Sequence, residues 1–289
     1  MSWRTVVISN NAKLDYQVGY LVVRETEETK KIHIDEIGTL IVENTAVSLT
    51  AYLLQELVHN KVKVIFCDHK RNPSSELLPY YGCHDTSVKV RRQTEWSDED
   101  QKSVWTEIVT EKIRNQAKLL MANKKSESEM LEQYVKEMQF GDATNREGHA
   151  AKVYFNALFG KSFTRTEDSP VNAALNYGYS ILLSMFNREV VANGYITQLG
   201  LFHNNMFNQF NLASDLMEPF RPIVDRKVLD LHPEKFEIEE KHSMLEIVEK
   251  EVVIDSRKEF LGNAVKIYTR SVFDAINDRD VSKISFFEL

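Results

Sequence analysis

The chain has 289 residues, of which 43% are hydrophobic and 27% are charged, and its formal net charge is −7. This length suffices for one large or two ordinary domains, each able to bury a core, and the low content of Gly (10) and Pro (6) argues against a disordered chain. The negative balance argues against a uniformly basic protein that coats nucleic acid, while leaving room for a local basic groove.

The cysteines and the hydropathy of the chain indicate the cellular compartment of the protein. Neither Cys67 nor Cys83 belongs to a Cys-x-x-Cys pair or to a zinc-type cluster, which favours a reducing compartment. The first residues show no charged-then-apolar leader, and the longest apolar stretch, around residues 179–186, is too short to span a bilayer. We therefore expect a cytoplasmic protein that does not enter a membrane.

Short β-rich runs dominate the first part of the chain. They cover residues 3–8, 20–24, 32–34 and 39–42, and they predict a small antiparallel sheet. Helical spacing of apolar residues follows over 49–59, and then a buried-strand pattern over 62–67. Prolines at 73 and 79, a glycine at 82 and paired serines predict an irregular linker over about 68–98.

After the linker the apolar period changes from two to about 3.6, which predicts a long helix that begins at Ser97 and carries acidic residues in its first turn. Further helices are predicted over 129–138, 146–159, 173–192, 216–231 and within 243–276. We predict an α+β protein with a small β-rich N-terminal domain over 1–85 and a larger, mainly α-helical C-terminal domain over 98–289. The absence of a Gly-rich phosphate loop argues against a P-loop hydrolase or a Rossmann dehydrogenase.

Glu147 stands where a helix should be apolar. On the predicted helix it shares a face with Ala150, Tyr154 and Leu158, which should pack inward. A buried carboxylate without a partner costs several kcal/mol, so Glu147 needs a metal, another cation or a proton. The alternative is a first-turn acid favoured by the helix dipole or paired with an arginine such as Arg188.

Two further clusters offer ligands of the same kind. His203 lies in an Asn-rich loop, where it is either a metal ligand or a hydrogen-bonded structural residue. Asp215 and Glu218 are three residues apart and so face the same way on a helix, where a cation would relieve their repulsion. The alternative for this pair is a solvated helix start capped by Ser214. A mixed nitrogen and oxygen ligand set suits Mg²⁺ or Mn²⁺ better than structural zinc.

These clusters carry a resemblance to a known family. The order Glu, His and then Asp-x-x-Glu-Pro-Phe-Arg-Pro-x-Val-Asp over 215–225 resembles the CRISPR-associated spacer integrases, the larger of the two core proteins of CRISPR adaptation. The likeness is closest to the type II-A proteins, through Val-Ile-Phe-Cys-Asp at 64–68, Asn-Arg-Glu-Gly-His-Ala-Ala-Lys-Val-Tyr-Phe-Asn at 145–156 and Phe-Asn-Gln-Phe-Asn-Leu at 207–212. It covers the whole chain, because that family also joins a β-rich N-terminal domain to a larger helical one.

The resemblance implies a metal-dependent DNA integrase and endonuclease that inserts short DNA spacers into a CRISPR array by transesterification at the repeat ends. It places the metal ligands and catalytic residues on Glu147, His203 and Glu218, with Asp215 as a supporting acid of the same metal set and Mg²⁺ or Mn²⁺ as the cofactor. Many members have aspartate at the position of Glu218, so the division of labour between Asp215 and Glu218 stays open.

The resemblance also implies partners. They are double-stranded DNA as prespacer and CRISPR repeat, a second copy of this chain joined through the N-terminal domain, and the small core adaptation protein, whose dimer bridges two dimers of the larger one. In type II-A systems of prokaryotes, the effector nuclease and a ring-forming DNA-end-binding protein take part as well. Candidate DNA-binding residues, which equally suit a solvated surface or local ion pairs, are Arg146, Arg221, Lys89, Arg91, Arg92, Lys161, Arg165 and Arg188.

Two alternatives belong to other classes. A metal-dependent nucleotide phosphohydrolase would use similar ligands, but it should offer a compact phosphate loop. A non-catalytic DNA-binding scaffold would leave the acids as ordinary helix-start residues. The alternatives differ from the integrase in whether Glu147, His203 and Glu218 converge.

Overall fold

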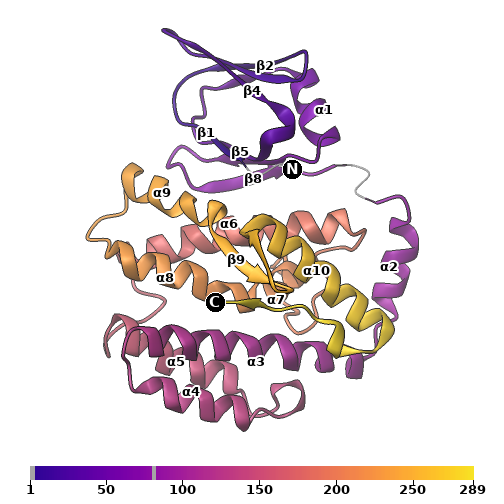
Figure 1. The fold of residues 1–289 in the computed structure, drawn as a ribbon, viewed down its shortest axis with the longest axis vertical. Helices are drawn as coiled ribbons and strands as arrows, with labels where there is room; N and C mark the ends of the chain where they lie inside the picture. The colour runs from indigo at the N-terminus through magenta and orange to yellow at the C-terminus, as the bar shows by residue number, and fades with distance from the viewer. Residues whose placement is uncertain (1–3, 80–82) are drawn as a thin grey trace. The chain divides into compact units, whose positions relative to one another are not determined.

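The computed structural model describes residues 4–79 and 83–289 (Figure 1). Internal contacts divide the chain into two compact units, Met1–Gly82 and Cys83–Leu289. The first unit is β-rich and the second is mostly helical, which confirms the predicted α+β class. Within the described residues, no helix has both the length and the apolar character needed to cross a membrane.

Two four-stranded sheets build the described part of the N-terminal unit. The first, in the order β1-β5-β7-β8, contains β1 (Arg4–Ile8), β5 (Ile37–Val42), β7 (Lys63–Cys67) and β8 (Pro73–Leu77). The second, in the order β4-β3-β2-β6, contains β2 (Lys13–Gln17), β3 (Tyr20–Arg24), β4 (Thr29–His33) and β6 (Ser48–Leu49). A short 3-10 turn, η1 (Ile34–Glu36), and the helix α1 (Ala51–His59) complete this part. Both sheets and α1 contribute to one apolar core, which includes Leu14, Leu40 and Leu53.

The pairing of these strands differs in part from the prediction. β2, β3 and β4 pair antiparallel as expected, but β1–β5 and β5–β7 are parallel, so the prediction of one antiparallel sheet was wrong. The connection from β5 to β7 carries α1, and a crossover of this kind returns the next strand in the same direction. Trp3, the predicted start of the first strand, lies outside the described residues.

The segment predicted as an irregular linker, 68–98, contains regular structure. β8 pairs with β7 at the edge of the first sheet, and α2 (Thr86–Thr94) lies in the second unit. Pro73 is the first residue of β8, and an edge strand tolerates proline there because one side of its backbone needs no partner strand. The prediction of an irregular chain was therefore wrong for both elements, and the predicted turn at Gly82 lies outside the described residues.

Helices make up most of the second unit. They are α3 (Asp98–Ala122), α4 (Glu127–Lys136), α5 (Arg146–Phe159), α6 (Pro170–Ala192), α7 (Asn211–Leu216), α8 (Arg221–Leu231), α9 (Ile238–Leu245) and α10 (Leu261–Asp278). Short 3-10 turns are η2 (Phe140–Asp142), η3 (Glu218–Phe220), η4 (Glu246–Glu249) and η5 (Val281–Lys283). A small sheet that the sequence did not predict has the order β10-β9-β11 and contains β9 (Glu251–Ile254), β10 (Arg257–Phe260) and β11 (Phe287–Glu288).

The predicted boundaries of α5 are confirmed, whereas the single helix predicted over 216–231 is divided. The turn η3 separates α7 from α8, because Pro219 and Pro222 lack the backbone N–H that a continuous helix would need. This break sets Glu218 in a tight turn between two helices rather than on the side of one.

In the second unit the helix α3 lies between α4 and α5 on one side and α8 and α10 on the other (Figure 1). The Ser97 side chain accepts a hydrogen bond from the Asp100 N–H and caps its first turn. Along its length α3 contacts α4, α5, η2, η3, α8 and α10. Its buried side is apolar at Trp105 and Ile108 but polar at Lys112 and Asn115. Elements that pack against the middle of α3 therefore contact an ammonium and an amide group.

At Gly178 the helix α6 packs tightly against side chains of α8 and α9. A Cβ atom at this position would lie 2.5 Å from Val224 Cγ1 and 2.8 Å from Met244 Cε. We predict that Gly178→Ala destabilises the protein by about 1–3 kcal/mol through overpacking. The matched control is Gly262→Ala in α10, where the nearest atom to the new Cβ is Met185 Cε at 3.8 Å. That change should be neutral or should stabilise the helix by up to about 1 kcal/mol. Urea unfolding measures both, and equal effects would contradict the packing shown here.

Candidate metal centre

Glu147 is held in the first turn of α5 by the segment that precedes it. The two carboxylate oxygens of Asp142 accept hydrogen bonds from the backbone N–H groups of Arg146 (2.6 Å) and Glu147 (3.1 Å). The Asn145 side chain caps the same turn by accepting from the Gly148 N–H at 3.3 Å. With the start of the helix fixed in this way, the Glu147 side chain projects toward α3, where its Oε1 atom contacts the Lys112 ammonium.

Glu218 is 3% exposed and lies in η3, yet it carries a charge. Arg221 Nε donates to its Oε1 atom at 2.9 Å, and Lys112 Nζ lies 2.5 Å from its Oε2 atom. Burial alone would raise the pKa of Glu218, but the positive charges of Arg221 and Lys112 outweigh it and hold that pKa below its usual value. Glu218 is therefore an ionised carboxylate inside the helical unit.

Lys112 joins Glu147 to Glu218. Its ammonium contacts the carboxylates of both, and its side chain is 7% exposed. Burial acts to lower the pKa of Lys112, but Glu218 and Glu147 together raise it above the usual lysine value. A carboxylate from α5 and one from the turn η3 thus converge on a single positive centre. The Glu218 Oε2 atom makes only this ion-pair contact and accepts no well-directed hydrogen bond from the described residues.

Asp215 is fully buried and organises the loop that carries His203. It accepts from the backbone N–H groups of Leu201 (2.6 Å), Phe202 (2.9 Å) and His203 (3.2 and 3.3 Å), and it also contacts the His203 Nδ1 atom. A carboxylate has about four lone-pair positions, and these contacts use all of them. Asp215 therefore orients the loop that carries His203 in this structure, and the division of roles between Asp215 and Glu218 stays a prediction.

The His203 ring is placed by two contacts. Its Nδ1 atom faces Asp215, and its edge meets the Trp105 ring of α3 at a centroid distance of 5.9 Å and an interplanar angle of 87°. The Asp215 hydrogen bond raises the pKa of His203 above its ordinary value, although partial burial opposes it. A carboxylate on Nδ1 leaves Nε2 for a metal, which is the usual support of a metal-binding histidine.

A third buried acid, Asp225, helps to hold Arg221 in place. Asp225 in α8 is 1% exposed and accepts hydrogen bonds from the hydroxyls of Tyr154 (2.8 Å) and Tyr179. Burial raises the pKa of Asp225 to about 6, and the two tyrosine hydrogen bonds counteract this only in part. Arg221 stacks over the Tyr179 ring at 4.7 Å, so the same network also holds the arginine that binds Glu218.

The structure places the carboxylates of Glu147 and Glu218 on the Lys112 ammonium and the His203 ring on Asp215. The ligand atoms of Glu147, Glu218 and His203 are too far apart in this structure to hold a single ion unless side chains move. In the described part of the chain, the one trio of His, Cys or acidic residues with ligand atoms within 4.8 Å of one another is Cys83, His84 and Asp85. The donor set nevertheless fits a hard divalent cation, because two carboxylates already surround a positive charge and an oriented imidazole lies nearby.

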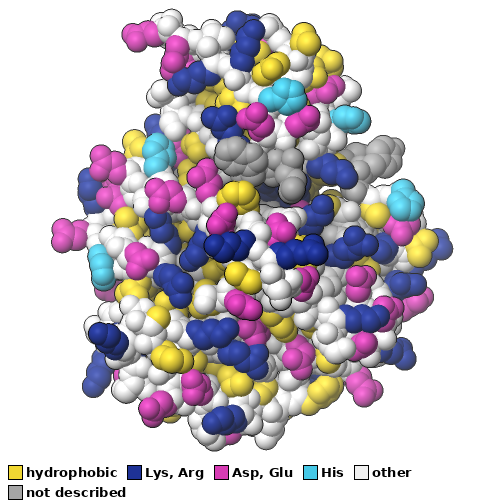
Figure 2. All heavy atoms as spheres, viewed as in Figure 1, with side chains coloured by type: hydrophobic (Ala, Val, Ile, Leu, Met, Phe, Trp, Pro, Cys, Tyr) yellow, Lys and Arg dark blue, Asp and Glu magenta, His cyan; other side chains and the backbone are white. Residues whose placement is uncertain are grey.

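The predicted basic residues do not form one group. Arg146 pairs with Glu137 at 2.6 Å, and Arg188 lies 3.6 Å from Glu189. Arg165 binds Asn172 and Asn176, Lys89 lies over the Tyr195 ring, and Lys161 is exposed, as are Arg91 and Arg92 on α2. On the face seen in Figure 2, basic side chains are interspersed with acidic ones. The DNA-binding role of these residues stays a prediction.

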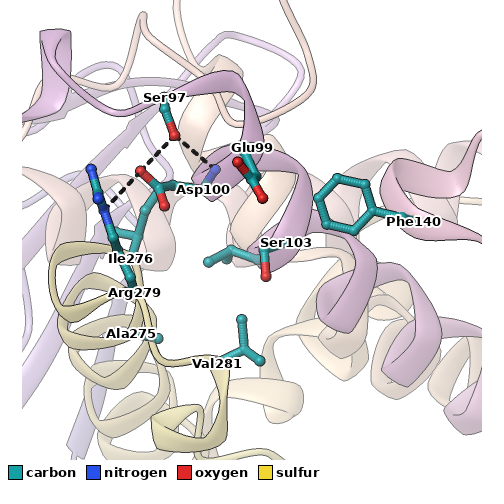
Figure 3. A pocket seen from close by; sticks show the side chains of 10 residues that line it. Ser97, Glu99, Asp100, Ser103, Phe140, Ala275, Ile276, Arg279 and Val281 are labelled. Atoms are coloured by element: carbon teal, nitrogen blue, oxygen red, sulfur yellow. Dashed lines mark hydrogen bonds and ion pairs between the residues drawn. The ribbon is translucent and has the colours of Figure 1, made fainter.

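A cavity of about 540 Å³ lies elsewhere in the unit, between the start of α3 and the end of α10 (Figure 3). Glu99 and Phe140 line it, and Asp100 binds the Ser97 hydroxyl at 2.6 Å and lies 3.4 Å from Arg279 Nε. Its lining includes none of the predicted metal ligands. The charged residues of its lining are Glu99, Asp100 and Arg279.

Sequence reasoning missed Lys112, Asp142 and the Tyr154–Asp225–Tyr179 cluster. Lys112 had a detectable signal, because it interrupts the buried stripe of α3 four residues after Ile108. The alternative partner considered for Glu147, Arg188, was wrong, since the carboxylate contacts Lys112 instead. The Tyr154–Asp225–Tyr179 cluster depends on contacts between distant segments, which periodicity does not reveal. Asp142 acts locally, on N–H groups four and five residues after it.

Solved structures share this fold. A casposase bound to integration product matches 98% of this chain and 94% of its own, with a TM-score of 0.77 at 16% identity. A Cas1 protein from Thermotoga maritima matches 94% of this chain and 97% of its own, with a TM-score of 0.75 at 17% identity. At these identities the likeness establishes the fold alone, which is one shared by Cas1 proteins and a casposase.

Sequence comparison then establishes the family. The model of the family described as CRISPR associated protein Cas1 matches residues 5–259. A CRISPR-associated endonuclease Cas1 of Neisseria meningitidis serogroup C (strain 8013) is 36% identical over 235 residues, which cover 80% of this chain and 77% of the relative. Another, from Francisella tularensis subsp. novicida (strain U112), is 26% identical over 281 residues, or 88% and 87% of the two chains. The chain belongs to the Cas1 family, as the resemblance indicated, and the type II-A assignment stays a prediction.

The raised pKa of Asp225 predicts a pH-dependent stability. The folded chain holds this proton up to about pH 6, whereas the ordinary value is 3.8, so the folded state loses relative stability as the pH rises through this window. Relative to Asp225→Asn, the wild type should lose about 2 kcal/mol of unfolding free energy between about pH 4.5 and about pH 7. Urea unfolding of both proteins at the two pH values measures this. A difference between them that does not change with pH would contradict a neutralised Asp225.

Proposed function

We propose that this chain is a metal-dependent DNA endonuclease and integrase of CRISPR adaptation, which inserts short DNA spacers into the CRISPR array. One observation carries the proposal. Two carboxylates from distant segments, Glu147 of α5 and Glu218 of η3, converge on one buried cationic position. Relatives described as CRISPR-associated endonucleases and the fold shared with a casposase bound to integration product support the same chemistry.

The residues have distinct roles in this proposal. Glu147, Glu218 and the Nε2 atom of His203 hold Mg²⁺ or Mn²⁺, and Asp215 keeps a proton on Nδ1, so that Nε2 offers its lone pair. When bound, the metal polarises the scissile phosphate and favours ionisation of the attacking hydroxyl. Arg221 stays on Glu218 and fixes its direction, because it is also stacked on Tyr179.

The reaction is a transesterification. The oxygen of a 3′-hydroxyl on a short duplex forms a bond to a phosphorus at the end of a CRISPR repeat. The bond from that phosphorus to the 3′-oxygen of the neighbouring nucleotide breaks, and that oxygen takes up a proton as the attacking hydroxyl loses one. The number of phosphodiester bonds is unchanged, so the protein needs no external energy source. It needs positioned charge, which Glu147 and Glu218 supply through the cation that they bind.

Partners follow from the family. We propose that the chain acts as a homodimer, joined through its N-terminal unit, with the small core adaptation protein and with double-stranded prespacer and repeat DNA. The small partner alone is supported by a solved Cas6-RT-Cas1–Cas2 complex, one chain of which shares this fold with a TM-score of 0.73 over 97% of this chain and 36% of that chain, at 18% identity. Participation of a type II-A effector nuclease and of a ring-forming DNA-end-binding protein belongs to the same proposal.

Strand transfer tests the proposal directly. A short duplex with free 3′-hydroxyls is incubated with a supercoiled plasmid carrying the repeat, the protein and its small partner, in Mg²⁺, Mn²⁺ or EDTA. We expect joined product with either metal and none in EDTA. Glu147→Gln keeps the side-chain shape but removes the charge, and it should reduce the product at least about 100-fold, as expected when one group that stabilises transition-state charge is lost.

The matched control is Glu132→Gln on the exposed side of the neighbouring helix α4, which should keep wild-type activity. DNA binding and the thermal midpoint are measured for all three proteins, so that loss of folding is recognised. Product from Glu147→Gln at the wild-type rate would exclude this site. DNA binding without product from the wild type, in both metals and with the partner present, would favour the non-catalytic scaffold.

A further inference from the structure

Lys112 is a charged residue on the buried side of a helix, where an apolar residue is expected. It comes from the middle of α3, is almost completely enclosed, and contacts the carboxylates of α5 and of η3. No other cation among the described residues contacts the Glu147 carboxylate, whereas Glu218 also has Arg221. The lysine is therefore the one group in this part of the chain that links the two acids.

The position of this ammonium is the position of the proposed metal. A divalent ion bound by Glu147 and Glu218 must lie between their oxygen atoms, where Lys112 Nζ now lies 2.5 Å from one and in contact with the other. Two cations at this separation repel each other strongly in a site of low dielectric. The ammonium must therefore move away when the metal enters, or stay and weaken the binding of the metal.

We propose that Lys112 is a built-in cation that holds Glu147 and Glu218 at the spacing of the metal site and competes with the divalent ion for them. The proposal rests on the proposed function, because it assumes that these two acids bind the metal. Lys112 is thus a positioning residue, and its charge sets a threshold of metal concentration below which the site stays closed by its own ion pairs.

A competing lysine and a merely structural lysine predict opposite effects of the substitution on metal affinity. Removing a structural residue lowers stability and weakens every function of the site. Removing a competing charge lowers the stability of the protein in EDTA, because Glu147 and Glu218 then lack their common partner. The same change should make Mn²⁺ bind more tightly, because the metal no longer displaces an ammonium.

The experiment measures Mn²⁺ affinity from the electron paramagnetic resonance signal of the free ion, with DNA absent. Lys112→Met should bind Mn²⁺ at least about tenfold more tightly than the wild type, which corresponds to about 1.4 kcal/mol. Lys112→Arg keeps the charge and should not gain affinity. Lys102→Met is the matched control, since Lys102 lies on the same helix with an exposed ion pair to Asp98 at 2.6 Å. Thermal midpoints in EDTA and in Mn²⁺ are recorded for each protein.

Weaker or unchanged Mn²⁺ binding by Lys112→Met, with a wild type that binds Mn²⁺ through Glu147, would overturn this inference and leave the proposed function intact. A wild type that binds no better than Glu147→Gln would instead remove the proposed metal site itself.

If Lys112→Met does not fold, ¹⁵N-lysine NMR of the wild type decides the question. The Lys112 ammonium signal, assigned by its loss in Lys112→Arg, should shift during a Mg²⁺ titration with the midpoint of metal binding. A signal that Mg²⁺ leaves unchanged would refute the competition.

Discussion

The pairing of a buried carboxylate with two cations is the interaction on which the helical unit depends. An ionised Glu218 inside a protein costs several kcal/mol unless opposite charges and hydrogen bonds compensate it. Lys112 comes from α3 and Arg221 from α8, so this requirement joins helices that are distant in sequence. Glu147 is drawn to the same ammonium from α5. The site is thus part of the packing of the fold, and the helices cannot shift independently without separating charges.

Three buried acids in the segment 215–225 show how surroundings give identical groups different tasks. Asp215 meets backbone N–H groups and an imidazole, Glu218 meets two cations, and Asp225 meets two tyrosine hydroxyls. The cations hold the pKa of Glu218 below its usual value, whereas burial against neutral donors raises the pKa of Asp225 to about 6. Glu218 is therefore kept charged with an oxygen facing the cation position, while Asp215 orients His203 and Asp225 supports Arg221 through Tyr179.

The sequence predicted the parts of this account that depend on local pattern. The inward direction of Glu147 followed from helical periodicity, and the observed α5 has the predicted boundaries. The sequence could not predict the ion-pair partner of Glu147, because Lys112 is 35 positions away in the chain and no spacing rule connects the two residues. The strand β2 was missed because its hairpin turn is Val18-Gly19, where Val18 adopts a φ of 44° that turns usually assign to Asn or Gly. Parallel pairing was missed because alternation of side chains does not specify the direction of the neighbouring strand.

The proposed function requires Glu147, Glu218 and His203 to bind one divalent metal at the position of the Lys112 ammonium. Anomalous diffraction from crystals soaked in Mn²⁺ would locate that metal. We expect a strong manganese peak in contact with both carboxylates and with His203 Nε2, with the Lys112 ammonium moved off that point. An unchanged Lys112 with no peak beside Glu147, or a manganese peak confined to Cys83, His84 and Asp85, would contradict it.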